Sequence, residues 1–492
     1  MALAPGDGAD GGGGAGGSGG AGGGQSGNAA AGRAAHAAKH GHRGRLFGTD
    51  GVRGIANGDL TPLLAYQLGR AGTFCLMRGD GRPRIMVGRD TRASGEMLEA
   101  ALVAGICSVG ADVVRAGIMT TPGVAVLVQR RGCTAGIVIS ASHNPAQYNG
   151  IKFFSSDGHK LLDDIEAQIE DLILEGGLDR LPSPLAEGVG RTYDDPGASA
   201  EYCAFLKSTV PGLRLDGWRV VLDCANGAAS HIAPRVFADL GAEVTAIHDQ
   251  PDGLNINRRC GAIDVRSLQR SVRELGAGVG LAFDGDADRL IAVDETGAAV
   301  DGDAILVACA LDLDARGELP LRTVVSTVMA NLGVDRALGE AGIGVVRVHV
   351  GDRHVLDAMR KRGLALGGEQ SGHIIFLRHA TTGDGILTGL QLVRVMQDSG
   401  LPLSKLAARM ERLPQCLVNV TVADRQAVHG AERVVAAVAA AEAKLKPWGR
   451  VLVRPSGTEP LVRVMVEGED DELVRRLAGE LADIIGRECG AG

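Results

Sequence analysis

Residues 278 to 290 read GVGLAFDGDADRL, an apolar run that ends in three aspartates at alternate positions, Asp284, Asp286 and Asp288. A short apolar run that stops abruptly is typical of a buried strand, and open α/β sheets bind ligands beyond the carboxyl ends of their strands. Three carboxylates this close repel one another, and each raises the pKa of the others. The stretch therefore predicts a strand followed by a loop that holds a cation or carries a nucleophile.

The same alternation of apolar strand and helix extends outward from this stretch. We expect strands at 84–88, 112–117, 135–140, 219–224, 243–248, 290–295, 323–327 and 345–350. Helices are expected between them at 95–109, 264–275, 303–313, 331–340 and 352–362. Continuous apolar strands alternating with helices predict α/β sheets covered on both faces. The last part differs, because strands at 416–422, 450–453 and 461–466 with helices at 427–445 and from 471 predict an α+β module.

The composition excludes several classes of protein. With 492 residues, 45% of them hydrophobic and 22% charged, the chain has the make-up of a globular protein of several domains. A net charge of −8 and only 3% aromatic residues argue against a nucleic-acid partner. The nine cysteines form no C-x-x-C pair, which indicates a reducing compartment. No apolar run reaches the ~18 residues of a membrane span, so we expect a cytoplasmic protein without a membrane partner.

Two loops before the aspartate stretch have the residues of a phosphate site. In FGTDGVRG (47–54), glycines let backbone amides approach an anion and Arg53 adds a bidentate donor. In SASHNPAQYNGIKFF (140–154), Ser142 follows an apolar strand and is accompanied by His143 and Lys152. Turns without chemistry remain the alternative for both loops. A serine hydrolase is not indicated, because the G-x-S-x-G elbow is missing.

The aspartate stretch has three interpretations. It can be a structural acidic turn. It can be an EF-hand, but the sixth loop position holds Arg289 instead of Gly and the flanking segments are strands. It can be a phosphotransferase loop, in which one aspartate is the nucleophile or all three hold a hard cation such as Mg²⁺.

Two later loops carry polar side chains between predicted strands. GGEQSGH (367–373) displays Glu369, Ser371 and His373, a set suited to sugar hydroxyls. RPSGTEP (454–460) combines a guanidinium, two hydroxyls and a glycine whose backbone can expose amides, which is the chemistry of a phosphate clamp. Its residues are Arg454, Ser456, Gly457 and Thr458. A surface turn and a plain hairpin turn are the respective alternatives.

Together and in this order, FGTDGVRG, ISASHNP, DGDADR, GEQSGH and RPSGTEP resemble the motifs of the α-D-phosphohexomutase superfamily. The resemblance covers the chain from residue 45 onward. It implies four domains around a central cleft, three of related α/β fold with mixed or parallel sheets and a C-terminal α+β domain. We expect these domains at 45–197, 198–297, 298–408 and 409–492. The glycine- and alanine-rich residues 1–44 are expected to form a disordered tail.

The resemblance also implies a role for each motif. Ser142 matches the serine that carries the transferable phosphate, and its phosphoserine oxygen would join Asp284, Asp286 and Asp288 in holding one Mg²⁺ per chain. Arg53, His143, Lys152 and Arg289 match residues near the transferring phosphate, and we expect Lys152 to transfer a proton with a lowered pKa. Glu369, Ser371 and His373 match the sugar loop. The phosphate clamp is matched by Arg454, Ser456, Gly457 and Thr458.

The implied activity is that of an isomerase that moves a phosphoryl group within a sugar phosphate through a bisphosphorylated sugar. FGTDG and the Gln of GEQSGH resemble the glucosamine branch, whose product supplies UDP-N-acetylglucosamine and cell-wall precursors. Glucose or mannose phosphates are the alternative substrates. An aspartate-nucleophile phosphatase, with Asp284 carrying the phosphate, and a non-catalytic sugar-phosphate sensor remain further alternatives. Dimers are common among similar proteins, so a homodimer is the expected assembly.

Overall fold

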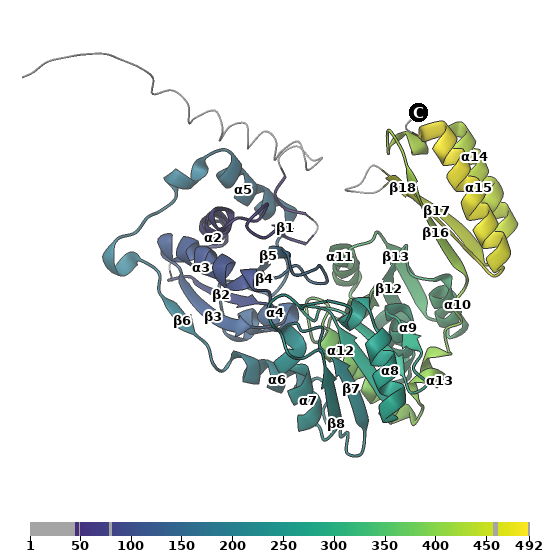
Figure 1. Ribbon diagram of the computed structural model, residues 1–492, viewed down its shortest axis with the longest axis horizontal. Coiled ribbons are helices and arrows are strands. Elements are labelled where there is room, and N and C mark those ends of the chain that lie inside the picture. Colours follow the sequence, from purple (N-terminus) through teal and green to yellow (C-terminus); the bar gives the residue numbers. More distant parts are fainter. Residues whose placement is uncertain (1–44, 49, 78–80, 456–460, 491–492) are drawn as a thin grey trace, which may run out of the picture. The chain divides into compact units, whose positions relative to one another are not determined.

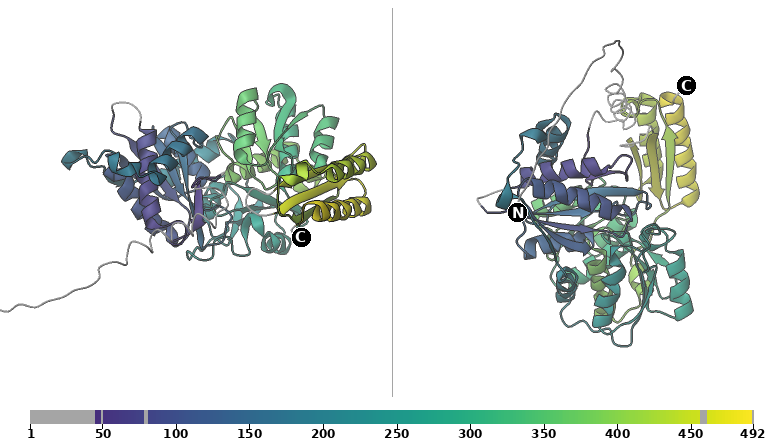
Figure 2. Two further views of the ribbon diagram at one scale, coloured as in Figure 1. Left: turned by 90° about the horizontal axis from the view of Figure 1, so that it is seen from above. Right: turned by 60° about the vertical axis from the view of Figure 1, so that its left-hand side comes forward.

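The computed structural model describes residues 45–490 except 49, 78–80 and 456–460 (Figures 1 and 2). The predicted tail 1–44 therefore lies outside the described residues. Among the described residues, no helix combines the length and the apolar character that a membrane crossing requires.

The first sheet has six strands in the order β1-β5-β4-β2-β3-β6. Its strands are β1 Val52–Ile55, β2 Arg84–Arg89, β3 Asp112–Ile118, β4 Ala135–Ile139, β5 Tyr148–Ser155 and β6 Thr192–Asp194. Its helices are α2 Pro62–Leu76, α3 Ser94–Ser108, α4 Thr121–Arg130 and α5 Asp163–Leu174. Because side chains alternate along a strand, Ile85 and Val87 of β2 join one core cluster with residues of α2 and α3, while Met86 joins another with residues of α4. Helices thus cover both faces.

The second sheet has the order β11-β10-β9-β7-β8 and contains the aspartate stretch. Its strands are β7 Arg219–Asp223, β8 Glu243–Ile247, β9 Val279–Phe283, β10 Leu290–Asp294 and β11 Ala299–Val300. The associated helices are α6 Ala198–Ser208, α7 Ala233–Asp239 and α8 Arg266–Leu275. The predicted strand 278–283 is β9, and it lies parallel to β7 and antiparallel to β10. The aspartates therefore fall in the β9–β10 turn.

The third sheet has the order β13-β12-β14-β15. Its strands are β12 Thr323–Thr327, β13 Gly344–Val348, β14 Leu366–Gly368 and β15 Ile374–Phe376. The associated helices are α9 Gly302–Ala315, α10 Leu332–Glu340, α11 Asp352–Arg362, α12 Gly385–Ser399 and α13 Leu403–Ala407. The predicted loop 367–373 connects β14 to β15, which pair antiparallel.

The first three sheets share one hydrophobic cluster. It contains Met86 from the first sheet, Leu222 from the second and Val324 from the third, all fully buried. Since apolar burial is the main favourable term in folding, this shared cluster fixes the three parts against one another.

The last part is a three-stranded antiparallel sheet, β16-β18-β17, with its own core. Its strands are β16 Gln415–Thr421, β17 Gly449–Pro455 and β18 Leu461–Gly468, and its helices are α14 Glu432–Leu445 and α15 Asp471–Cys489. Both helices lie on one face of the sheet (Figures 1 and 2). The predicted helix 427–445 is shorter than expected, because 427–429 form a separate 3₁₀ turn. The α+β prediction agrees with this arrangement.

Two observations bear on the predicted domain boundaries. Ala299 and Val300 still pair with β10, so the chain leaves the second sheet after the predicted limit at 297. Met410 still belongs to the shared cluster, beyond the predicted limit at 408. We propose domain limits near 300 and 413 for these two boundaries.

A buried carboxyl in the third part gives a test of this packing. Burial and then the neighbouring Asp301 raise the pKa of Asp303 to about 7, while its Oδ2 accepts a hydrogen bond from the backbone of Asn331 at 2.8 Å. An unfolded Asp has a pKa near 3.9, so the folded chain holds the extra proton between about pH 4 and 7, and stability falls as the pH rises. The Asp303→Asn variant cannot ionise at this position. We expect its free energy of unfolding to rise relative to the parent by on the order of 3 kcal/mol from pH 4 to 8.

Chemical or thermal unfolding of both proteins across this range checks the prediction. A difference in stability that stays constant with pH would contradict it.

Candidate active site

Ser142 lies just beyond the carboxyl end of the buried strand β4, in the loop that leads to β5. Its backbone has φ +51°, a left-handed value that is uncommon for a residue with a side chain, and only 1% of the residue is exposed. Its hydroxyl donates a hydrogen bond to Asp284 Oδ2 at 2.7 Å and lies 3.3 Å from His143 Nδ1. The serine and the aspartate stretch, predicted separately from the sequence, therefore meet.

Arg92 holds this loop in place through hydrogen bonds from a buried guanidinium. The side chain is fully buried, and Nε donates to Asp90 at 2.8 Å. Its other nitrogens donate to four loop carbonyl oxygens, those of Ser142, Asn144, Pro145 and Tyr148, at 2.5 to 3.0 Å. Five donors in a rigid planar fork make arginine suited to this task. The guanidinium thus fixes the unusual backbone conformation that aims the hydroxyl of Ser142.

Asn257 gives the loop a second support from the second part of the chain. Its Nδ2 donates to the carbonyl oxygens of Ser142 at 2.8 Å and Asn144 at 3.1 Å. Neither Arg92 nor Asn257 was among the residues predicted from the sequence. The sequence held one weak indication of Arg92, because it lies in the polar stretch GRDTRASG (88–95) at the end of a predicted strand.

The three aspartates have different electrostatic environments although all are buried. Burial, followed by Asp288 and Asp286, raises the pKa of Asp284 well above its usual value. Burial would raise the pKa of Asp286 as well, but Lys152 and hydrogen bonds from Lys152 and Thr121 lower it instead. Asp286 Oδ2 accepts from Lys152 Nζ at 2.8 Å and from Thr121 Oγ1 at 2.5 Å.

The aspartates also fit a hard divalent cation. One carboxylate oxygen of each lies within 4.8 Å of the others, and Oδ1 of both Asp286 and Asp288 is buried without a hydrogen-bond partner among the described residues. Buried polar atoms of this kind call for a partner, and an all-oxygen set is what Mg²⁺ prefers. With Ser142 Oγ beside Asp284, these residues can hold Mg²⁺.

Lys152 departs from its prediction in one respect. It lies on β5 opposite Val138, is 1% exposed, and its Nζ is 2.8 Å from Asp286 and 3.0 Å from Asp50. Burial alone would lower the pKa of Lys152, but the two carboxylates outweigh it and raise the pKa. The expected lowered pKa is therefore wrong, because Asp286 first and then Asp50 lie within ion-pair distance of the buried ammonium.

The other predicted cations surround the same loops. Arg53, on β1, donates to the carbonyl oxygen of Ala141 at 3.4 Å and pairs with Asp50. Arg289 has Nε 3.7 Å from Asp288 Oδ1, and its backbone donates to Asp284. Burial, then Arg289 and Arg53, lowers the pKa of His143 to about 4. The imidazole next to Ser142 is therefore neutral at pH 7.

The predicted sugar loop is attached directly to the aspartate loop. The backbone of Leu290 donates to the carbonyl oxygen of Gly372 at 3.0 Å, and Gly372 has φ +89° with space only for hydrogen, since a Cβ would lie 2.1 Å from the oxygen of Leu290. Glu369 accepts from the backbone of Gly351 at 3.0 Å. His373 is 3% exposed and accepts from the backbone of Gly383 at 3.2 Å, while Ser371 is exposed.

A chain of alternating charges links the three predicted loops. Lys160 pairs with both Asp50 and Asp352, and Asp352 Oδ2 lies 3.8 Å from His373 Nε2. Together with the contacts of Lys152, this gives a continuous sequence of charged partners that begins at the aspartate loop and ends beside His373 of the predicted sugar loop: Asp286, Lys152, Asp50, Lys160, Asp352. Sequence reasoning assigned no role to Asp50, Lys160 or Asp352.

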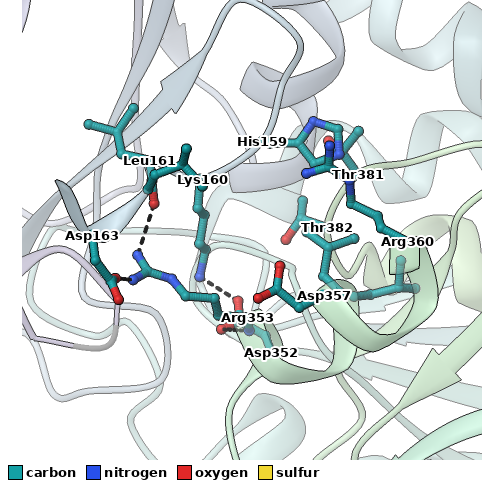
Figure 3. Close-up of a pocket in the computed structure, with 13 residues that line it drawn as sticks. His159, Lys160, Leu161, Asp163, Asp352, Arg353, Asp357, Arg360, Thr381 and Thr382 are labelled. Carbon is teal, nitrogen blue, oxygen red and sulfur yellow. Dashed lines mark hydrogen bonds and ion pairs between the residues drawn. The ribbon is translucent and has the colours of Figure 1, made fainter. Parts of the chain in front are cut away.

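A cavity of about 110 Å³ lies beside this chain, between the segment after β5 and helix α11 (Figure 3). Lys160 and Asp352 line it, and Arg353 crosses from α11 to contact Asp163 and the carbonyl oxygen of Leu161. These contacts join the first and third parts of the chain at the edge of the site.

Of the predicted phosphate clamp, Arg454 alone is described. It stands on β17 opposite Arg463 of β18, and burial followed by Arg463 lowers the pKa of Arg454. Ser456, Gly457 and Thr458 lie outside the described residues.

Comparison with known proteins agrees with this arrangement part by part. Residues 44–179, 200–297 and 301–413 match the family models for the alpha/beta/alpha domains I, II and III of phosphoglucomutase/phosphomannomutase. Residues 417–484 match the C-terminal domain of the same family. The chain belongs to the phosphoglucomutase/phosphomannomutase family. The resemblance seen in the sequence and the predicted four-domain α/β fold are thereby confirmed.

Relatives in this family cover nearly the whole chain. A phosphoglucosamine mutase from Moorella thermoacetica is 57% identical over 89% of this chain and 98% of its own. Another from Shouchella clausii is 53% identical over 91% of this chain and 100% of its own. A phosphoglucomutase/phosphomannomutase family protein from Burkholderia thailandensis has the same fold, with a TM-score of 0.74 at 24% identity over 89% of this chain and 97% of its own.

The hydrogen bonds from Arg92 to the Ser142 loop predict that a substitution of Arg92 lowers the rate of phosphoryl transfer. Lysine at this position keeps the charge but cannot reach Asp90 and four carbonyl oxygens together. A misplacement of about 1 Å costs on the order of 10²-fold in rate. We therefore expect Arg92→Lys to lower kcat for hexose phosphates by about 10²-fold with a small change in KM.

Steady-state kinetics measures this split, and circular dichroism verifies that the variant is folded. Arg84→Lys is the matched control, because Arg84 is exposed and donates to one carbonyl oxygen, that of Arg131. A raised KM with an unchanged kcat would show that the assigned positioning role is wrong.

Proposed function

We propose that this protein is a phosphoglucosamine mutase, an isomerase that interconverts glucosamine 6-phosphate and glucosamine 1-phosphate. The observation that carries the proposal is the contact between Ser142 Oγ and Asp284 Oδ2, 2.7 Å apart in a buried loop with two further aspartates. The phosphoglucosamine mutases from Moorella thermoacetica and Shouchella clausii support the choice of sugar, since they match almost the whole chain. Its product would supply UDP-N-acetylglucosamine and cell-wall precursors.

In this proposal Ser142 Oγ carries a phosphoryl group that moves to the free oxygen of the bound sugar phosphate. The Ser142 Oγ–P bond breaks as the new sugar O–P bond forms, and the proton that the sugar hydroxyl loses is balanced by the one that Ser142 Oγ gains, which gives a bisphosphorylated sugar and a free serine. The bound sugar then reorients, and its other phosphoryl group is transferred to Ser142. This regenerates the phosphorylated enzyme, and substrate and product differ only in the position of the phosphate. A bisphosphorylated sugar would also serve as the primer.

The site residues have two roles in this proposal, which are to neutralise charge and to transfer a proton. A phosphoserine and a substrate phosphate each carry roughly −1.5 to −2 charge, and Arg53, Arg289 and Lys152 offset this repulsion. Mg²⁺, when held by Asp284, Asp286 and Asp288, supplies further stabilisation of the charge on the transferring group. Because its pKa is raised, Lys152 acts through its charge. His143, neutral and 3.3 Å from Ser142 Oγ, is then the proposed proton acceptor.

The remaining predicted residues bind the sugar and its second phosphate. Glu369 and Ser371 would contact the sugar hydroxyls, with His373 fixing their loop through Gly383. The N-acetylphosphoglucosamine mutase of Aspergillus fumigatus, solved in complex with GlcNAc-6P and magnesium, shares the fold with a TM-score of 0.63 over 93% of this chain and 99% of its own. Arg454 with Ser456, Gly457 and Thr458 would hold the distal phosphate. A homodimer in the cytoplasm remains part of the proposal.

The proposed activity is tested by comparing sugars. With Mg²⁺ and a small amount of bisphosphorylated hexose, we expect kcat/KM for glucosamine 6-phosphate to exceed that for glucose or mannose 6-phosphate by about 10-fold or more. Ser142→Ala should lower the rate by on the order of 10³-fold or more, whereas Ser108→Ala, at the end of α3, should not. A preference for glucose or mannose would favour the alternative mutases, and full activity of Ser142→Ala would refute the mechanism.

The aspartate-nucleophile alternative is tested by locating the phosphate. Mass mapping of phosphorylated enzyme should find the group on Ser142, stable to hydroxylamine. Phosphate on Asp284, released by hydroxylamine, would identify a phosphatase-like mechanism instead.

Removing the guanidinium of Arg454 tests the phosphate clamp. If this side chain binds the distal phosphate in both the ground state and the transition state, Arg454→Ala should raise KM by about 10- to 100-fold and change kcat less. Arg475→Ala, an exposed position on α15 that pairs with Asp471, is the control. An unchanged KM for Arg454→Ala would contradict the assignment.

A further inference from the structure

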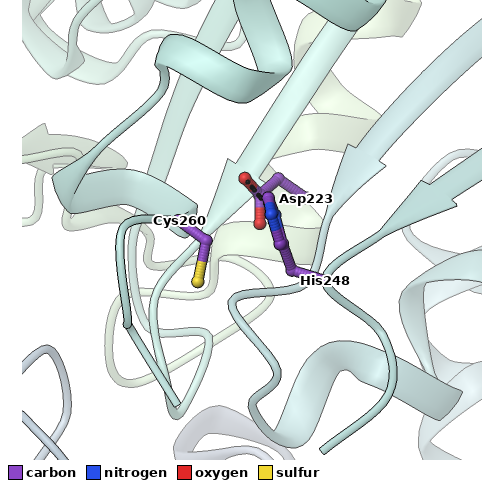
Figure 4. A group of neighbouring side chains, drawn as sticks. All are labelled: Asp223, His248 and Cys260. Atoms are coloured by element: carbon purple, nitrogen blue, oxygen red, sulfur yellow. Dashed lines mark ion pairs between the residues drawn. The ribbon is translucent and has the colours of Figure 1, made fainter. Parts of the chain in front are cut away.

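A second group of metal-ligating side chains lies in the second part of the chain, apart from the three aspartates. Asp223 ends β7, His248 directly follows β8, and Cys260 lies in the loop after His248 (Figure 4). Because β7 and β8 are neighbouring parallel strands, their carboxyl ends meet at one edge of the sheet. One oxygen of Asp223, one ring nitrogen of His248 and the sulfur of Cys260 all lie within 4.8 Å of one another.

The polar atoms of this group have few hydrogen-bond partners among the described residues. Asp223 is fully buried, and its Oδ1 accepts from the backbone of Ala225 at 3.0 Å. Its Oδ2 forms an ion pair with His248 Nδ1 at 3.1 Å, and both buried atoms lack a hydrogen-bond partner among the described residues. Buried polar atoms rarely lack partners in folded proteins, and a bound ion is one of the explanations.

We propose that Asp223, His248 and Cys260 bind a thiophilic divalent cation of the Zn²⁺ class. One carboxylate oxygen, one imidazole nitrogen and one thiolate form a ligand set that suits Zn²⁺ and not Mg²⁺. Three protein ligands leave the fourth tetrahedral position to water, which can enter because the side chain of His248 is 30% exposed.

The position of the site gives the bound cation a structural consequence. His248 and Cys260 flank residues 249–259, and this loop contains Asn257, which donates to the carbonyl oxygens of Ser142 and Asn144. The carbonyl oxygen of Gly253 in the same loop accepts from the backbone of Ala93 at 2.9 Å, next to Arg92. A cation bound to both ends closes the loop and reduces its freedom in the unfolded chain. It therefore stabilises the support of the Ser142 loop without contacting substrate.

Cobalt(II) is the spectroscopic probe for this site. Full-length protein is stripped of metal, saturated with Mg²⁺ to occupy the aspartates, and titrated with Co²⁺. We expect one equivalent to give the tetrahedral d–d bands and a thiolate-to-metal charge-transfer band, with Zn²⁺ displacing it. Zn²⁺ should also raise the Tm of the protein.

The variants identify the ligands. Cys260→Ser should abolish the thiolate band and weaken binding by about 100-fold, and His248→Gln should weaken binding while keeping the thiolate band. Cys224→Ser is the matched control, because Cys224 is buried next to Asp223 but lies outside the group. Circular dichroism verifies that each variant is folded.

Two results would overturn the proposal. One is wild-type protein that shows no thiolate band at saturating Co²⁺. The other is a band that persists in Cys260→Ser or disappears in Cys224→Ser. Neither readout depends on the mutase activity, so the proposal is tested separately from the proposed function.

Discussion

The rest of the site depends on the burial of three carboxylates around one hydroxyl. Asp284, Asp286 and Asp288 are almost completely shielded from water, where their charges are costly unless paired. The described residues supply Lys152 for Asp286 and the hydroxyl of Ser142 for Asp284, but leave two oxygens without a hydrogen-bond partner. Such unpaired oxygens suit a hard cation.

The placement of two strands brings Ser142 and the three aspartates together. Ser142 follows β4, and the aspartates follow β9, so each group lies beyond the carboxyl end of a strand in its own sheet. The shared hydrophobic cluster then fixes the two sheets so that Ser142 Oγ and Asp284 Oδ2 are 2.7 Å apart. Precise placement is needed because phosphoryl transfer is catalysed mainly by positioning and electrostatics. The hydrophobic core therefore contributes to function by fixing the distance between Ser142 Oγ and Asp284 Oδ2.

Buried polar residues hold the loops in positions that the packing of the core sets. Arg92 and Asn257 hold the carbonyl oxygens of the Ser142 loop from two different parts of the chain. Lys160 connects Asp50 to Asp352 and thus links the loop 47–54 to helix α11. Since a buried ionic contact is lost at considerable cost when one partner is removed, these residues tie the loops into one network.

The sequence by itself determined the strand-and-loop pattern, the α/β class with a different last part, and the residue types at each loop. It did so because apolar periodicity and glycine-rich turns are local properties, and the ordered motifs resemble those of one family. It did not reveal Arg92, Asn257, Asp50, Lys160 or Asp352, whose partners lie far away along the chain. It also gave the wrong direction for the pKa of Lys152. Only the tertiary structure decided these points, because burial and charge pairing arise when separate strands are packed side by side.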